Sequence, residues 1–273
     1  MTLADVPAAQ RADLSFAIEA ARSAGERVLA LRATGRWTQE PTLADIGDQA
    51  ADGFLQGFVR GRYPQDGILS EETADSSARL SNERVWIIDP LDGTREYSQG
   101  RADWAVHVAL AIGGQPALAA VALPAQQRLL WGVCQDGARL SGLEGAGRLV
   151  AAEEAGPAQP RIAVSRSHTP SWMPALAAEF GAQLVPCGSV GAKVALLVLG
   201  DADLYAHRKG LKEWDTCAPE VLARALGWFV SRLDGTPVPY NQPNPNHDEF
   251  LVCRPADTKK MLAALQGAGA LRR

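Results

Sequence analysis

The 273-residue sequence contains only four cysteines, and they lie far apart in the chain. None belongs to a CxxC pair, and no two histidines show HxH or HxxxH spacing, so we expect neither a disulfide framework nor a zinc site. No segment approaches the ~18 uninterrupted apolar residues of a membrane span. The N-terminus also lacks the basic start and apolar run of a signal peptide. These absences predict a cytoplasmic protein with no place in a membrane.

Neither sign of charge dominates the composition. The chain has 27 Lys and Arg against 31 Asp and Glu, which gives a net charge of −4. This balance argues against a nucleic acid polymer or an anionic membrane as the main partner. Because 47% of the residues are hydrophobic, the chain can bury a substantial core.

The hydrophobic periodicity predicts two helices near the N-terminus, over 11–32 and 43–61. Short apolar runs follow. Turn residues such as Gly113-Gly114 and Asp136-Gly137 separate several of them, which is typical of an antiparallel meander. The predicted strands cover 67–70, 85–89, 104–112, 117–124 and 128–134.

A stretch rich in Gly, Ala and Pro at 141–160 marks a change of pattern. Beyond it strands and helices alternate, which indicates an α/β layer. The strands are predicted at 161–165, 183–187 and 203–207, and the helices near 171–180, 191–200 and 217–227. We therefore predict an N-terminal domain over 1–150 and a C-terminal domain over 151–273.

The stretch WIIDPLDGTREYSQG at 86–100 places two aspartates three residues apart where an apolar strand ends. Pro90 lacks a backbone donor, so we expect the strand ladder to stop there and Asp92 to turn back toward Asp89. Two carboxylates that close repel each other unless a cation lies between them, and oxygen ligands favour Mg²⁺ or Mn²⁺ over zinc. Gly93 permits tight backbone geometry, and Thr94 stands where a short helix with free amides can begin, a typical phosphate site.

Two further acidic spots lie at the ends of other segments. Glu71 and Glu72 in LSEET follow an apolar run, and Asp215 in EWDTCAPE comes just before a predicted helix. Each alone is equally explained as an ordinary cap or strand-end residue. Their order around the DPLDGT stretch is what favours a shared metal site.

With LSEE, WIIDPLDGT and WDTCAPE in this order, nearly the whole chain resembles the inositol monophosphatase-like, lithium-sensitive, Mg²⁺-dependent phosphatases. The resemblance implies an α/β (α+β) fold with αβαβα layers: an N-terminal antiparallel sheet with helices and a C-terminal mixed α/β sheet. The form DPLDGTREYSQGRADWAVHVAL, with VSRSH at 164–168 and GSVGAK at 188–193, is most similar to the CysQ-type 3'(2'),5'-bisphosphate nucleotidases. Those enzymes remove the 3'-phosphate of 3'-phosphoadenosine 5'-phosphate, a by-product of sulfate assimilation.

The resemblance also implies roles for individual residues. One divalent ion would be held by Glu71, Asp89 and the Leu91 carbonyl, and another by Asp89, Asp92 and Asp215. Two or three Mg²⁺ ions are implied, with Mn²⁺ as a substitute. The implied catalytic set is Glu71, Thr94 and Asp48, in which Thr94 orients a water and Asp48 works with it as general base. The implied substrate-binding residues are Gly93, Thr94, Ser165, Arg166, Ser167, His168, Ser189, Lys193 and Asp215.

Several of these assignments have alternatives. Asp45 and Asp52 share the helix face of Asp48 by spacing, so Asp48 is chosen by resemblance alone, and a solvated acidic face is the other interpretation. A lysine that family members usually carry before this aspartate is missing from RWTQEPTLADIGD. The alternative interpretation of Arg166 and Lys193 is that they are ordinary surface residues. Tyr205, His207, Arg208 and Lys209 are placed near the nucleoside by their position before Glu213.

Other enzyme classes fit the sequence less well. A haloacid dehalogenase-type loop needs DxDGT, but Pro90 stands two residues before Asp92. A GxSxG serine hydrolase motif fails because residue 187 is cysteine. A second LDGT at 233–236 is interpreted as a turn between short strands, and His107 as a structural residue.

The remaining alternatives are inositol-1-phosphatase or fructose-1,6-bisphosphatase activity on the same site, or an inactive binding protein. The resemblance allows for a homodimer, although the sequence itself is silent on the oligomeric state.

Overall fold

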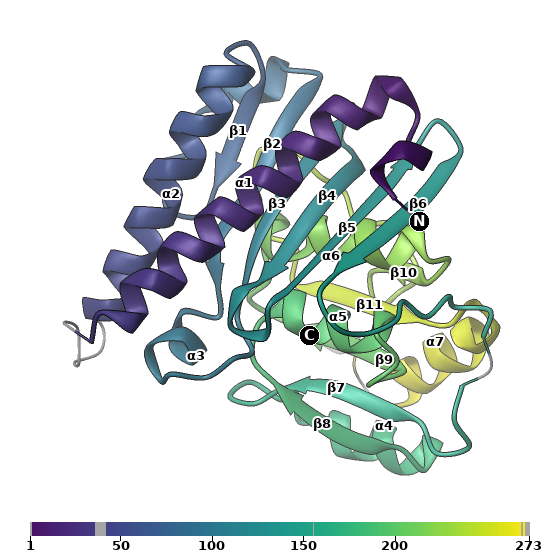
Figure 1. Ribbon diagram of the computed structural model, residues 1–273. Coiled ribbons are helices and arrows are strands. Elements are labelled where there is room, and N and C mark those ends of the chain that lie inside the picture. Colours follow the sequence, from purple (N-terminus) through teal and green to yellow (C-terminus); the bar gives the residue numbers. More distant parts are fainter. Residues whose placement is uncertain (1, 36–41, 155, 269, 271–273) are drawn as a thin grey trace.

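The computed structural model describes residues 2–35, 42–154, 156–268 and 270, and its elements stack in five layers (Figure 1). Two helices form the first layer, a six-stranded sheet the second, two helices the third, a five-stranded sheet the fourth and two helices the fifth. This is the αβαβα order that the sequence predicted. No helix in the described part of the chain combines the length and apolar character of a membrane span.

The first layer consists of α1 (Ala8–Ala33) and α2 (Thr42–Arg62), close to the predicted helices. Helix α1 presents small residues to the sheet, so that it approaches closely. At Gly25 a side chain would collide with the ring of Pro124. The fully buried Leu14, Ala17 and Ala21 fill this interface, and burial of apolar surface is what stabilises it.

The second layer is a sheet in the order β1-β2-β3-β4-β5-β6. Its strands are β1 (Gly67–Ser70), β2 (Arg84–Asp92), β3 (Ala105–Ile112), β4 (Gln115–Leu123), β5 (Arg128–Gln135) and β6 (Ala138–Glu144). The predicted meander is correct from β2 onward. It is wrong for β1, which pairs with β2 in parallel, because the connection at 71–83 is long enough to return the chain to the same edge. Strand β6 was not anticipated, although the Asp136-Gly137 turn before it was.

The ladder between β2 and β3 does not stop at Pro90, which corrects a second expectation. Asp89 pairs with His107 and Asp92 pairs with Ala105, so three steps on β2 match two on β3. This is a β-bulge, a position that tolerates proline. Residues two apart on a strand face the same side of a sheet, and the bulge therefore brings Asp89 and Asp92, three apart, onto one face.

The fourth layer is a mixed sheet in the order β10-β11-β9-β7-β8. Its strands are β7 (Arg161–Ser165), β8 (Gln183–Cys187), β9 (Leu204–Arg208), β10 (Phe229–Ser231) and β11 (Glu249–Cys253). Strand β7 runs parallel to β8 and β9, whereas β11 is antiparallel to β9 and β10. The LDGT at 233–236 follows β10 as a turn, in which Asp234 accepts a hydrogen bond from the Thr236 amide at 2.9 Å. No strand follows it directly among the described residues.

Helices α5 (Val190–Val198) and α6 (Glu213–Ala225) lie between the two sheets, and α4 (Met173–Phe180) and α7 (Thr258–Gly267) cover the outer face of the second (Figure 1). Helix α6 begins four residues earlier than expected, so Asp215 lies in its first turn and not before it. The reason is a cap: the Lys212 amide donates to the Asp215 carboxylate at 2.6 Å. The short elements are η1 (Leu3–Asp5), η2 (Ser77–Ser81), η3 (Pro124–Gln126), η4 (Pro255–Asp257) and α3 (Thr94–Ser98).

Candidate active site

Asp89 is the most deeply buried carboxylate at the end of β2, at 1% exposure. Its Oδ1 accepts a hydrogen bond from the Leu91 amide at 3.1 Å. Its Oδ2 has no hydrogen-bond partner among the described residues. Burial raises the pKa of Asp89 well above its usual range, and the charges of Glu71 and Asp92 add to the effect. A buried carboxylate oxygen without a partner is costly, so this atom points to a missing cation.

Asp92 is held on one side by a hydrogen bond and an ion pair from two different elements. Its Oδ2 accepts a hydrogen bond from the Gly191 amide of α5 at 2.8 Å and lies 3.2 Å from Nε2 of His107 on β3. Burial alone would raise the pKa of Asp92, but the charge and contact of His107, the charge of Lys193 and the Gly191 amide together outweigh burial, and the pKa is lowered. Asp92 is therefore ionised and fixed in orientation.

Glu71 and Asp215 come from other elements and converge on the same corner. Glu71 directly follows β1 and lies on the solvent-facing rim. Reduced hydration, followed by the charges of Glu72 and Asp92, raises its pKa to about 7. Burial, followed by the charges of Asp92 and Glu71, raises the pKa of Asp215 to about 7. Both carboxyl groups thus respond to the charge of Asp92, and Asp215 responds to the charge of Glu71 as well.

The donor set fits a hard divalent cation. Asp89, Asp92 and His107 offer ligand atoms that all lie within 4.8 Å of one another. His107, however, directs Nδ1 at the Trp214 carbonyl, 3.2 Å away, and Nε2 at Asp92, so both ring nitrogens already face oxygen atoms. The groups left for an ion are carboxylate oxygens, which suit Mg²⁺ or Mn²⁺.

Asp48 differs from the two other aspartates on its helix face. Asp45 is exposed, and Asp52 accepts hydrogen bonds from Ser70 at 2.6 Å and Thr73 at 2.7 Å. Asp48 is only 7% exposed. Burial, followed by the charges of Glu72 and Glu71, raises its pKa to about 8. The structure therefore distinguishes Asp48 from Asp45 and Asp52, which their spacing in the sequence could not do. The first half of the lysine-free segment before Asp48, residues 36–41, lies outside the described residues.

Gly93 and Thr94 stand at the start of α3, as expected. Gly93 has φ of 92°, a conformation that favours glycine, and Thr94 is the first residue of the helix. A side chain at Gly93 would come within 3.2 Å of the Ser189 side chain. The start of α3 thus lies against the start of α5, where Ser189 caps the helix by accepting a hydrogen bond from the Ala192 amide at 2.8 Å.

A pocket of about 280 Å³ opens beside Asp92. Its polar lining includes most of the predicted substrate-binding residues: Gly93, Ser165, Ser167, His168, Ser189 and Lys193. Tyr205, His207 and Lys209 line it as well. Lys193 is buried, which lowers its pKa, and its ammonium group donates to the Gly188 carbonyl and lies 5.3 Å from the centre of the Tyr205 ring.

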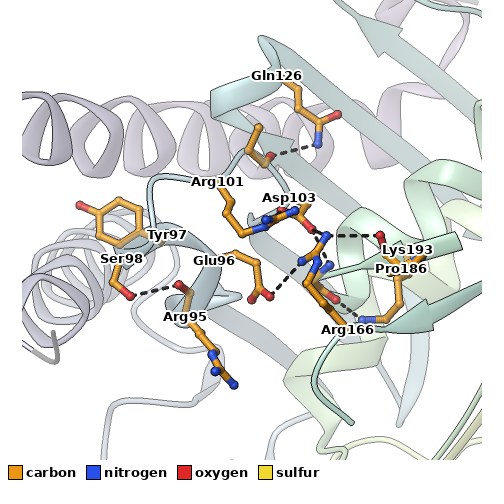
Figure 2. A network of polar contacts seen from close by, with 12 residues as sticks. Arg95, Glu96, Tyr97, Ser98, Arg101, Asp103, Gln126, Arg166, Pro186 and Lys193 are labelled. Carbon is orange, nitrogen blue, oxygen red and sulfur yellow. Dashed lines mark hydrogen bonds and ion pairs between the residues drawn. The ribbon is translucent and has the colours of Figure 1, made fainter. Parts of the chain in front are cut away.

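Four predicted residues are not part of this lining: Thr94, Arg166, Arg208 and Asp215. Figure 2 shows Arg166 between Glu96 and Asp103, to which its guanidinium group is bound at 3.3 and 2.7 Å. Asp103 also accepts a hydrogen bond from the Gly188 amide at 2.7 Å. Arg208 binds the Ala270 carbonyl and lies 3.9 Å from Glu249. Arg166 thus joins the segment after α3 to the segment before α5.

Sequence reasoning missed the contact between His107 and Asp92 and the hydrogen bond that the Gly191 amide donates to Asp92. His107 was interpreted as structural, and its complete burial agrees with a packed residue. The signal for its partner lies in the strand register, because His107 pairs with Asp89 across the sheet. That register is set by tertiary pairing, which a single sequence does not reveal.

Known proteins share both the sequence pattern and the fold. The model of the inositol monophosphatase family matches residues 9–268. A Mycobacterium bovis protein named 3'-phosphoadenosine 5'-phosphate phosphatase is 40% identical over 253 residues, 90% of each chain. The structure of CysQ from Bacteroides thetaiotaomicron aligns with a TM-score of 0.74 at 26% identity, covering 89% of this chain and 97% of that one. Inositol monophosphatase II from Staphylococcus aureus shares the fold, with a TM-score of 0.80 at 20% identity, over 96% of this chain and 99% of that one.

Proposed function

Because this chain belongs to the inositol monophosphatase family, we propose that it is a Mg²⁺-dependent phosphomonoesterase acting on 3'-phosphoadenosine 5'-phosphate. Water attacks the 3'-phosphorus, the bond from phosphorus to the ribose O3' breaks, and O3' takes up a proton. The products are AMP and inorganic phosphate. We infer direct hydrolysis without a phosphoenzyme, because the carboxylates assigned to the metal ions would place and activate a water molecule.

The observation that carries this proposal is the carboxylate corner beside a cationic pocket. Glu71 follows β1, Asp89 and Asp92 end β2, and Asp215 lies in α6. The pKa values of Glu71, Asp89 and Asp215 are raised, and Asp89 Oδ2 has no hydrogen-bond partner among the described residues. The adjoining pocket carries the cationic side chains of Lys193 and Lys209. Anionic oxygens beside cations suit a metal ion with a phosphorylated substrate.

We assign Glu71, Asp89, Asp92, Asp215 and the Leu91 carbonyl to two or three Mg²⁺ ions. When bound, such ions neutralise phosphate oxygens, lower the pKa of a water and stabilise the leaving oxygen. Asp48, with its raised pKa, and the Thr94 hydroxyl would hold and deprotonate the attacking water. The amides of Gly93 and Thr94 would bind the phosphate that is cleaved. In this assignment region 1–150 supplies most metal ligands, and region 151–273 supplies Asp215 and the rest of the pocket.

The phosphate that stays on the product needs cations away from the metal ligands. Lys193, Ser165, Ser167, His168 and Ser189 are assigned to it, because all line the pocket. The name of the 40% identical relative supports the bisphosphate nucleotide over other phosphates. Arg166 remains a sequence-based candidate, since its guanidinium group binds Glu96 and Asp103.

A side-by-side comparison of kcat/KM tests the substrate. We expect 3'-phosphoadenosine 5'-phosphate to exceed inositol 1-phosphate and fructose 1,6-bisphosphate. A clear preference for inositol phosphate would overturn the assignment. Release of inorganic phosphate only after Mg²⁺ is added would exclude the alternative of an inactive binding protein.

A further inference from the structure

Glu71 and Asp215, which the proposed function assigns to the metal ions, belong to different layers of the fold. Glu71 follows β1 at the edge of the first sheet, and Asp215 lies in α6 between the sheets. One segment, residues 240–247, touches the neighbourhoods of both. We call this segment the strap.

The strap is attached to α6 at three places. The Tyr240 hydroxyl donates to Glu220 at 2.8 Å, and Nε2 of His247 lies 2.6 Å from the Thr216 hydroxyl. Between them Glu213, only 1% exposed, accepts hydrogen bonds from the amides of Asn241 at 2.6 Å and Gln242 at 2.7 Å. Glu213 stands two residues before Asp215 and so ties the strap to the turn that carries this carboxylate.

Arg79 attaches the strap to the connection between β1 and β2. Its side chain is 1% exposed, and its guanidinium group donates to the Asn241 side chain at 2.7 Å and the Gln242 carbonyl at 2.8 Å. The same group binds both oxygens of Asp75 at 2.6 and 2.8 Å. Arg79 also packs against β1, where a side chain at Gly67 would lie 3.1 Å from the Arg79 Cβ.

The guanidinium group of Arg79 therefore donates hydrogen bonds from two of its edges. One edge binds Asp75, four residues after Glu71, and the other binds the turn that Glu213 caps. Arginine can do this because its donors form a fixed planar fork, whereas a lysine ammonium is a single point of attachment. This chain of contacts runs from the Glu71 loop through the strap to the first turn of α6.

We propose that Arg79, acting through Asn241, Gln242 and Glu213, is a positioning residue that sets Glu71 against Asp215 and thereby tunes the affinity for the divalent cation. The proposal rests on the assignment of these carboxylates to a metal. Arg79 does not line the pocket, so it acts through the ligands and not on the substrate.

Metal binding to the purified protein, stripped of ions, tests this directly. Mn²⁺ is titrated calorimetrically into the wild type and into Arg79→Lys. We expect Mn²⁺ binding to weaken roughly 10–100-fold, the range seen when partners of metal ligands are removed. Saturating Mg²⁺ should restore kcat to within a few-fold of the wild type, because Arg79 touches no reacting group.

Asn241→Gly is the second variant. Asn241 has φ of 55°, which glycine adopts readily, so this change removes the side-chain contact without straining the turn. Asn241→Gly should weaken Mn²⁺ binding less than Arg79→Lys does. If Arg79→Lys does not fold, the Mn²⁺ affinity of Asn241→Gly alone tests the proposal. The matched control is Arg84→Lys, which alters an arginine paired with Asp13 and Asp66 at the start of β2. Its Mn²⁺ affinity should equal that of the wild type.

A purely structural role predicts a different pattern. If Arg79→Lys and Asn241→Gly lower the melting temperature but bind Mn²⁺ like the wild type, the proposal is wrong while the metal site stands. If the wild type binds Mn²⁺ no better than Asp89→Asn, the metal site itself is wrong and the proposal falls with it.

Discussion

Nε2 of His107 lies 3.2 Å from Oδ2 of Asp92, in the interior of the first sheet. The other ring nitrogen lies 3.2 Å from the Trp214 carbonyl, one residue before Asp215. Burial by itself would lower the pKa of His107, but the charge and contact of Asp92, the Trp214 carbonyl and the charge of Asp215 together outweigh burial, and the pKa is raised. A single cationic ring therefore holds one proposed metal ligand and the helix turn that carries another.

Replacing this ring should weaken the metal site. In His107→Val, Asp92 loses its ion pair and keeps only the hydrogen bond from the Gly191 amide, so it is held less firmly and we expect Mg²⁺ affinity to fall roughly 10–100-fold. Calorimetric titration and the Mg²⁺ dependence of kcat measure this. His107→Asn, which keeps a polar side chain, should recover part of the affinity. Equal affinities for the wild type and His107→Val would contradict the argument.

Asp89→Asn should nearly abolish activity. Asp89 is assigned to both metal ions, and loss of the several kcal/mol of charge stabilisation that metals supply corresponds to about a 10³-fold drop in kcat. The assay uses saturating Mg²⁺, with Asp136→Asn, a turn residue at the far end of β5, as control. Near-normal turnover of Asp89→Asn would remove Asp89 from the assignment.

These residues show which parts of the site a sequence encodes. Asp89, Asp92, Gly93 and Thr94 follow one another in the chain, so the strand end, the bulge and the helix start that bring them together are local properties. Even there, proline was taken as the end of the ladder, because the bulge depends on pairing with β3. The periodicity of the sequence predicted most of the individual helices and strands, whereas their layer order was implied by the family resemblance.

Contacts between distant segments were not predictable in the same way. Arg166 was expected at a phosphate because of the motif around it, yet its partners Glu96 and Asp103 lie far away in the chain. The choice of Asp48 over Asp45 and Asp52 likewise depends on which side chain Ser70 and Thr73 bind. Such choices are made by packing in three dimensions.

The raised pKa values predict an unusual pH dependence without metal. Folding raises the pKa of Asp215 from 3.8 to about 7. The folded state therefore holds a proton that the unfolded state releases above about pH 4. The stability that this proton gives is lost as pH rises through 7, by up to roughly 4 kcal/mol. In EDTA the melting temperature should therefore fall between about pH 5 and 8.

Mg²⁺ should reverse this trend, because an ion binds the ionised carboxylates. The gain in melting temperature on adding Mg²⁺ should then grow as pH rises from about 6 to 8. The Asp215→Asn variant serves as comparison, since it has no proton to lose at this position. A gain that is independent of pH would argue against a shared metal site at Glu71 and Asp215.

Gly191→Ala tests how tightly α5 packs on this corner. The Gly191 amide donates a hydrogen bond to Asp92 at 2.8 Å. A side chain at Gly191 would overlap the His107 ring and lie 3.1 Å from the Ala105 Cβ. Since both neighbours are buried in the sheet, we expect a loss of about 1–3 kcal/mol in unfolding free energy together with weaker Mg²⁺ binding. Gly57→Ala on α2 has open space around the new Cβ and should instead gain about 0.5–1 kcal/mol. Denaturant unfolding of both variants, with and without Mg²⁺, separates the two effects, and a Gly191→Ala protein as stable as Gly57→Ala would mean that α5 does not press on His107.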